Sequence, residues 1–577
     1  MSENEYRPET EAYETDPEGN LVPEEVPDPA GAANRSLGRS SMVMAAGTFT
    51  SRALGLVRNL VLIAAVGVNI GAANAFDVAN KIPNVLFAIL ASGMLNAVLV
   101  PQIVRAYQRK GGQEFVNRLL TVAGVIMLAI TLMLTLGSAW LIGLYIDDWT
   151  PELTGLAVAF GFWCIPQLFF YGLYTLLGQV LNARSQFGPF MWAPVMNNIV
   201  SIAGFGLFIV IFGGYDGDAG THAISTWTPA KIGLLGGSAT LGIAAQALIL
   251  IWPLWRSGFK FRFRWGIRGM GMGTMGKVAA WTFAAALLEQ VAVLVITRVT
   301  SAASEVSGEA IGVAGNAAYT QALMIYLLPH SLITVSIATA LFTQISAAAG
   351  AGDFAKVRND LSLGMRTISI FTVFATAVLT VLAIPVTRVM LFTVRNPEEI
   401  ISVAAVLAVM SIGLVPLGAM VLMKWAYFAF EDGRTVFVIQ IPVAAITIAG
   451  SLLGMVYLEP AWWAVAAGGS MALGNIVAVA GRLAGLRRHL GGLDGRRILR
   501  LHAQLLVATA ASVAVGWPML RLFPDVAAST FSGLFACIVI GLVMLGIYVG
   551  ALKIMRVREL DTLVSPITAR LRRSRTP

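Results

Sequence analysis

The feature that most constrains this chain is a series of long apolar windows, which recur from about residue 41 to residue 553. Each window holds 18 or more residues, enough for a helix to cross a hydrocarbon core of ~30 Å. Hydrophobic residues make up 57% of the 577 residues and charged residues only 12%, well below the share in soluble domains. We therefore expect an all-α polytopic membrane protein with about fourteen spans, at roughly 41–67, 73–106, 117–145, 153–182, 190–213, 232–256, 275–300, 312–348, 363–391, 400–430, 434–457, 461–486, 500–523 and 527–553.

Lysine and arginine indicate how these spans are oriented. They crowd the connections after the even-numbered spans, whereas the opposite connections carry mainly acids. The positive-inside rule then predicts that both termini lie in the cytoplasm. The basic residues counted in this way are Arg105, Arg109, Lys110, Arg118, Arg184, Arg256, Lys260, Arg262, Arg264, Arg268, Lys356, Arg358, Arg434 and those from Arg482 through Arg500.

The two ends of the chain differ from the apolar middle. Residues 1–34 hold ten acids and one base, a composition typical of disorder. We predict a disordered acidic cytoplasmic tail over 1–38 and a basic cytoplasmic tail over 557–577. Because the chain beyond residue 34 carries 39 bases against 21 acids, we expect attraction to anionic lipid heads, and no motif indicates nucleic-acid binding.

An internal repeat divides the middle of the chain. LVPQIVRAYQRKGGQEFVNRL (99–119) aligns without a gap with LFTQISAAAGAGDFAKVRNDL (341–361), at an offset of 242 residues. This offset equals six spans, so the repeats have the same orientation, as in one class of transporters. We predict two parallel-related six-helix lobes, 39–268 and 269–490, with two further helices over 491–556. Two lobes with a cavity between them suggest alternating access.

A polar stripe follows one face of the second predicted span. Asp77, Lys81, Asn84, Ser92 and Asn96 recur at intervals of three, four or eight residues and therefore share a helix face. Lipid does not tolerate such a face, so it should look into protein or water. Asp77 precedes Lys81 by four residues, and one interpretation is that the two simply neutralise each other.

Two arginines in the first predicted span have no comparable acidic partner nearby in the sequence. Arg52 and Arg58 are six residues apart, so no single nearby acid pairs with both. The planar guanidinium suits phosphate, and together with Lys81 these residues suggest an anionic substrate, such as a diphosphate. For Arg52 the alternative is that its side chain reaches the cytoplasmic surface.

Three further charges fall within predicted spans. Glu289 is buried by its position and could pair with Arg298 or carry a coupling cation, and Lys424 is a similar candidate for a cavity charge. Cys164 and Cys537 also fall within spans, where we expect inert packing and neither a disulfide nor a metal.

Motifs for catalysis are missing from the sequence. The four histidines form no HExxH motif or His–Cys grouping, and there is no GxSxG or Walker A sequence. We expect a membrane transporter and no enzyme, with no cofactor and no nucleotide site. An ion gradient or the membrane potential is then the default energy source.

Three patches of sequence give the chain a resemblance to a known family. They are SRALGLVRN (51–59) with AFDVANKIPN (75–84), LNARSQFGPFMWAPVMNN (181–198), and YFAFEDGRT (427–435). These patches resemble the MurJ/MviN-type lipid II flippases of the MOP exporter superfamily, and MWAPVMNN is similar to actinobacterial members. The resemblance covers about residues 41–490 and extends to the last two spans in topology alone.

The resemblance implies a function in cell-wall biogenesis. It implies that the chain moves lipid II, the undecaprenyl-diphosphate-linked peptidoglycan precursor, from the inner to the outer leaflet. It also implies a cationic cavity between the lobes and a groove for the polyprenyl tail beside the last two spans. Arg52, Arg58 and Lys81 match basic residues of the family, whereas Asn74 replaces an acid that many members have.

Two other functions remain alternatives. One is an exporter of drugs or of other lipid-linked polysaccharides within the same superfamily, which would tolerate loss of Arg52 and Arg58. The other is a non-transporting scaffold that recruits cell-wall synthesis proteins through the acidic tail. Deletion of residues 1–34 should inactivate a scaffold and spare a flippase.

Overall fold

A computed structural model of the 577-residue chain describes residues 29–91, 103, 112–147, 149–184, 186–215, 223–266, 276–307 and 312–560. All regular secondary structure within these residues is helical. The first lobe contains α1 (Pro29–Val66), α2 (Gly71–Leu90), α4 (Gly112–Leu136), α5 (Ser138–Tyr145), α6 (Pro151–Cys164), α7 (Gln167–Ala183), α8 (Phe187–Phe212), η3 (Ile224–Thr226), α9 (Pro229–Leu248) and α10 (Ile251–Arg256).

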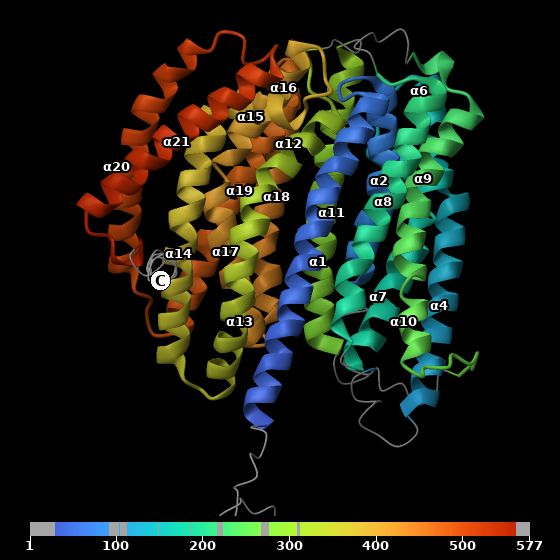
Figure 1. Ribbon diagram of the computed structural model, residues 1–577, viewed down its shortest axis with the longest axis horizontal. Coiled ribbons are helices and arrows are strands. Elements are labelled where there is room, and N and C mark those ends of the chain that lie inside the picture. Colours follow the sequence, from blue (N-terminus) through green and yellow to red (C-terminus); the bar gives the residue numbers. More distant parts are fainter. Residues whose placement is uncertain are drawn as a thin grey trace, which may run out of the picture.

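The second lobe repeats this order of long and broken helices. It contains α11 (Gly276–Val306), α12 (Asn316–Pro329), the short π-helical turn η4 (His330–Thr334), α13 (Val335–Gly350), α14 (Phe354–Val381), α15 (Ala383–Met390), α16 (Pro397–Ser411), α17 (Leu414–Ala429), α18 (Gly433–Tyr457), η5 (Pro460–Trp462) and α19 (Trp463–His489). A final pair, α20 (Gly495–Met519) and α21 (Thr530–Ile554), is joined through η6 (Leu520–Leu522) and packs on α14 and α15 at one end of the molecule (Figure 1).

The described helices confirm a polytopic membrane protein. Twelve of them, some continuous through a short break, are long and apolar enough to cross a membrane, and the pair α16–α17, bent by 50°, makes a thirteenth. The remaining predicted span is α2, whose polar residues lower its mean hydropathy. Helix α2 nevertheless packs among the other helices, against α6, α7, α11 and α12.

Two corresponding helices of the lobes share a capping signal at their N-termini. Helices α6 and α16 begin with the same local signal, a capping side chain followed by proline. Thr150 accepts a hydrogen bond from the backbone of Leu153, and Asn396 accepts one from the backbone of Glu398. Proline at the first helical position fits because its missing N–H has no partner there.

The first helix begins earlier than the predicted boundary. Helix α1 starts at Pro29, inside the segment 1–38 that was expected to be a disordered tail, while residues 1–28 lie outside the described part of the chain. The run of Ala, Ser, Leu and Arg after Pro29 contains no second proline, so nothing in it interrupts a helix. Helix α1 ends at Val66, where Gly67 adopts a left-handed φ of +76°.

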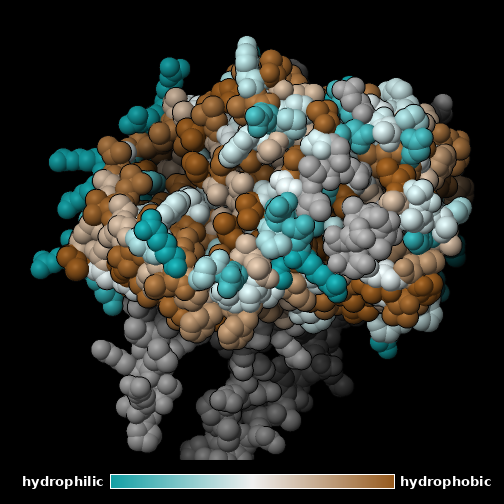
Figure 2. All heavy atoms as spheres, turned by 90° about the horizontal axis from the view of Figure 1, so that it is seen from above, coloured by the Kyte–Doolittle hydropathy of each residue, from teal (hydrophilic) through white to brown (hydrophobic). Residues whose placement is uncertain are grey.

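The interior of each lobe is packed, and the perimeter is apolar. In the first lobe, Phe76 meets Phe160 and Phe205 edge to face. Large apolar side chains are also exposed on outer helices, including Val210, Val456 and Ile554. Such exposure suits contact with lipid. Seen from the end of the bundle in Figure 2, hydrophilic side chains are scattered among apolar ones.

Candidate functional site between the two lobes

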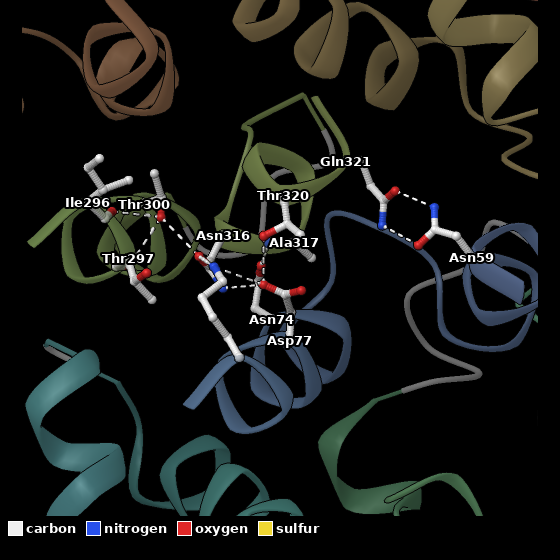
Figure 3. A network of polar contacts seen from close by, with 11 residues as sticks. Asn59, Asn74, Asp77, Ile296, Thr297, Thr300, Asn316, Ala317, Thr320 and Gln321 are labelled. Carbon is white, nitrogen blue, oxygen red and sulfur yellow. Dashed lines mark hydrogen bonds and ion pairs between the residues drawn. The ribbon is translucent and has the colours of Figure 1, made fainter. Parts of the chain in front are cut away.

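The candidate site lies where α2 of the first lobe meets α11 and α12 of the second. The apolar face of α2, with Val78, Ala79 and Ile82, is completely buried. Its polar face carries Asp77 and Lys81 towards the second lobe, as the helical spacing of the sequence predicts. Hydrogen bonds between these helices connect the lobes (Figure 3).

An ion pair with neutral partners forms the centre of this polar network. Lys81 Nζ lies 3.2 Å from Asp77 Oδ2, so the two charges neutralise each other within α2. The amide of Asn316 bridges them: its oxygen accepts from Lys81 at 2.7 Å, and its nitrogen donates to Asp77 at 2.7 Å. Thr320 also donates to Asp77, at 2.9 Å. The side chains of the pair remain 19% and 20% exposed, so the network is open on one side.

Asn74 extends the network by one turn of α2. Its amide nitrogen donates to the Ser304 hydroxyl at 3.0 Å, and its oxygen accepts from the backbone N–H of Ala317 at 2.9 Å. A Cβ atom at Gly315 would lie only 2.7 Å from this amide. Glycine at 315 therefore allows the start of α12 to approach α2 closely. Asn74 thus both donates and accepts at this contact without carrying a charge.

A pair of amides joins α1 to α12. Asn59 donates to Gln321 at 2.6 Å, and Gln321 donates back to Asn59 at 3.3 Å, as Figure 3 shows. Neither residue is charged, and the pair crosses the boundary between the lobes. Every contact of the second lobe in this network is thus made by an amide, a hydroxyl or a backbone group.

The three cations of the predicted cluster have three different environments. Arg52 donates to the backbone carbonyl of Ser331 in η4, while Lys81 is bound to Asp77 and Asn316. Arg58 makes no hydrogen bond or ion pair with the described residues, and its electrostatic neighbour is the Tyr171 phenol on α7. Arg58 is therefore the cation of this set without a hydrogen-bond or ion-pair partner among the described residues.

The polar stripe of α2 is only partly described. Asn84 is exposed although Pro83 and Val85 beside it are buried, so it faces open space one turn beyond Lys81. Ser92 and Asn96, the last two polar positions predicted for this face, lie outside the described residues.

The pairing suggested for Glu289 and Arg298 is wrong. Arg298 instead forms an ion pair with Asp147, in the connection between α5 and α6, at 2.8 Å. Nine residues separate Glu289 from Arg298 along α11, about 13 Å of helix. Glu289 is exposed rather than buried. Lys424 is half-buried, with its ammonium 5.9 Å from the centre of the Phe428 ring.

Sequence reasoning missed a buried arginine in the second lobe. Arg482 was counted among loop cations, but it lies within α19 and is 1% exposed. It donates to the backbone carbonyl of Met420 at 3.3 Å and is an electrostatic neighbour of Glu289. The sequence did indicate that Arg482 belongs to the span, because it lies inside an apolar stretch, five residues before the basic pair Arg487–Arg488.

A second polar contact joins the lobes near the end of α1. Tyr215 donates from its hydroxyl to Glu399 Oε1 at 3.2 Å, and Asn69 donates to Ser402 at 2.9 Å. Glu399 lies in the first turn of α16 and is 1% exposed. Glu399 follows the helix cap, a position where exposed acids are common. Sequence reasoning therefore did not single it out.

The contacts described above suit a rearrangement of one lobe against the other. Among the described residues, no group of three or more His, Cys, Asp or Glu side chains could hold a metal ion. The lobes meet through side-chain hydrogen bonds, which can exchange for water when the lobes separate.

Comparison with known proteins agrees with this architecture. A protein from Rhizobium meliloti described as a probable lipid II flippase MurJ is 25% identical over 419 residues, which cover 69% of this chain and 72% of that protein. A protein from a Synechocystis species with the same description is 26% identical over 424 residues, covering 72% and 75% of the two chains.

Solved structures show the same fold. A lipid II flippase MurJ in an inward closed conformation matches with a TM-score of 0.66 at 19% identity, covering 91% of this chain and all of that one. An inward-facing multidrug resistance transporter of the MATE family, within the MOP superfamily, matches at 0.59 with 14% identity, covering 80% of this chain and 99% of that one. The family model described as lipid II flippase MurJ matches residues 63–556. The chain belongs to the lipid II flippase MurJ family.

Proposed function

We propose that this protein moves lipid II from the inner to the outer leaflet by alternating access of its two lobes. The observation that carries the proposal is the match to the lipid II flippase family across residues 63–556, from the last turn of α1 through the final helix pair. Both termini lie in the cytoplasm in this proposal, because the basic connections predict that side for them.

Arg58 is the residue proposed to meet the diphosphate. Lys81 is occupied by Asp77 and Asn316, and Arg52 by the Ser331 carbonyl, whereas Arg58 has no such partner among the described residues. An arginine held in a membrane without a fixed anion is costly, and an anionic substrate would remove that cost. Asn84, exposed one turn from Lys81, supplies a neutral group for sugars or phosphate.

Alternating access fits the contacts between the lobes. The Asn59–Gln321 pair, the Asn316 bridge and the Tyr215–Glu399 bond are all side-chain contacts that can break without unfolding a helix. The membrane potential is the proposed energy source, since moving one charge through 100 mV is worth about 2.3 kcal/mol.

The test is reconstitution into liposomes with fluorescent lipid II. Access of a reagent to the label is measured from each side, with and without an imposed potential. Transport above protein-free liposomes is expected, and it should increase with the potential. A folded, reconstituted protein that leaves lipid II in its original leaflet would contradict the proposal.

Drug export is the second candidate, because the MATE transporter structures share this fold. A hydrophobic cationic drug requires acids in its path and has no use for Arg58. Full activity of Arg58→Ala, together with transport of cationic dyes, would favour drug export over lipid II transport.

A further inference from the structure

One segment of the first lobe takes no part in the proposed transport path. After α10, residues 260–265 alternate between cations and aromatic residues and read Lys-Phe-Arg-Phe-Arg-Trp. The structure leaves this segment outside the helices. Where such a chain is extended, successive side chains point to opposite sides, so the cations and the aromatic rings separate onto two faces.

Contacts with α4 hold this segment in place. Gln113 donates to the carbonyl of Lys260 at 3.3 Å, and the backbone N–H of Arg264 donates to the Thr121 hydroxyl at 3.3 Å. The segment therefore lies across the first turns of α4, at the end of the bundle where α10 ends (Figure 1). The positive-inside rule predicts that this is the cytoplasmic end.

An apolar cavity of about 480 Å³ lies beside this segment, between α4, α7 and α10. Its lining includes Leu120, Met127, Phe169, Leu173 and Trp255, and Lys260 is the one charged residue among those that line it. The volume is typical of cavities that hold small ligands.

The cations beside the cavity are not paired with any acid in the described part of the chain. No ion pair between described residues involves Lys260, Arg262 or Arg264. The aromatic residues are open, with Phe263 68% exposed and Trp255 69% exposed. Aromatic and basic side chains together are typical of the boundary between lipid and water.

Two requirements together select one kind of ligand. A free phosphate ion would satisfy the cations and leave the cavity unfilled, whereas a neutral lipid would fill the cavity and leave the cations unpaired. A lipid with an anionic head satisfies both, because its acyl chain suits the cavity and its phosphate suits the cations. We propose that the cavity and Lys260, Arg262 and Arg264 form a binding site for one anionic phospholipid of the adjacent leaflet.

The test uses the purified full-length protein with phosphatidylglycerol and phosphatidylcholine of identical acyl chains. Lipid binding is counted by native mass spectrometry over a range of lipid concentrations, with and without inorganic phosphate. Wild type should bind phosphatidylglycerol more tightly than phosphatidylcholine. Inorganic phosphate at the same concentration as the lipid should not compete, because it gains nothing from the apolar cavity.

Two variants separate the head-binding part of the site from the chain-binding part. Lys260→Gln/Arg262→Gln/Arg264→Gln should weaken phosphatidylglycerol binding by at least tenfold, since each cation near an anionic lipid contributes roughly a fivefold factor. Gly124→Phe should weaken it similarly by filling the cavity, because a Cβ atom at Gly124 meets nothing within 4 Å and the helix is not displaced.

Matched controls test the specificity of these losses. Arg488→Gln/Arg496→Gln/Arg500→Gln removes three exposed cations from the end of α19 and the start of α20, and Gly206→Phe adds the same ring at another open position. Both controls should bind as wild type does. Equal affinity for the two lipids, competition by phosphate, or unchanged binding by either site variant would overturn the proposal.

Discussion

The two lobes repeat one architecture but carry different chemistry at their junction. Aligned through Ile82–Asn84 and Leu328–His330, α2 has Asp77 and Lys81 where α12 has Leu323 and Leu327. The first lobe thus supplies both charges, and the second lobe binds them through the neutral side chains of Asn316 and Thr320. Because the ion pair lies within one helix, separating the lobes would not leave an isolated charge on either side.

The largest expected effect is on the unpaired cation of the first lobe. Arg58→Ala should reduce lipid II transport at least tenfold in liposomes, because the diphosphate loses its charged partner. Arg58→Lys should retain part of the activity through its charge. Lys424→Ala, which removes a half-buried cation from the second lobe, is the matched control and should cost less than threefold. Equal losses of transport in Arg58→Ala and Lys424→Ala would contradict the proposal that the substrate's charge is bound mainly by the first lobe.

The ion pair itself should show strong coupling. Asp77→Asn or Lys81→Met alone should lower the free energy of unfolding by about 2 kcal/mol, less than the 3–5 kcal/mol typical of fully buried pairs because this one is partly exposed. The double variant should recover part of that loss, since no lone charge remains. A double-mutant cycle in detergent, followed by denaturant unfolding, measures the coupling, and strictly additive losses would contradict it.

The neutral amide pair should contribute less. Asn59→Ala and Gln321→Ala should each cost about 1 kcal/mol, with a coupling of about 0.6 kcal/mol, the average for hydrogen bonds between membrane helices. Thermal unfolding of the two single variants and the double variant measures this coupling. If the coupling energy of Asn59 and Gln321 equalled that of Asp77 and Lys81, charge would not explain the difference between the amide pair and the ion pair.

The smallest expected effect concerns the Tyr215–Glu399 contact. Tyr215→Phe removes one hydrogen bond between the lobes and should favour opening at that end by roughly threefold. Labelling of Asn84→Cys by an impermeant maleimide added outside, in a Cys537→Ala background, reports the opening. Tyr145→Phe, at a buried tyrosine within the first lobe, is the control. Unchanged labelling by Tyr215→Phe would mean that this bond does not hold the lobes together.

The charged half of the site could be predicted from the sequence, and the neutral half could not. The spacing of Asp77 and Lys81 along an apolar helix indicated both a buried polar face and their mutual pairing. Asn316 and Gln321 gave no comparable signal, because amides are common at helix starts and in spans, and their role depends on packing between distant segments. The same limit applied to Glu399, whose burial by Tyr215 comes from the other lobe.

The bend between α16 and α17 could not be predicted from the sequence either. Sequence periodicity predicted one span over 400–430, but the two halves differ in direction by 50°. The corresponding break between α6 and α7 stays straight enough to count as one span, although Pro166 lies within it. The presence of a proline at a break therefore does not predict which of the two breaks is bent.

The internal ion pair has an electrical consequence. Asp77 and Lys81 move together with α2, so the pair carries no net charge when the lobes rearrange. Its contribution to gating charge is then close to zero, because a voltage acts on net charge displaced across the membrane. A voltage acts instead on charges without a partner on the same helix, such as Arg52 and Arg58, and on the diphosphate itself. The Asp77–Lys81 pair can therefore hold the lobes in register without adding to the charge that the field moves, and the cargo can supply that charge.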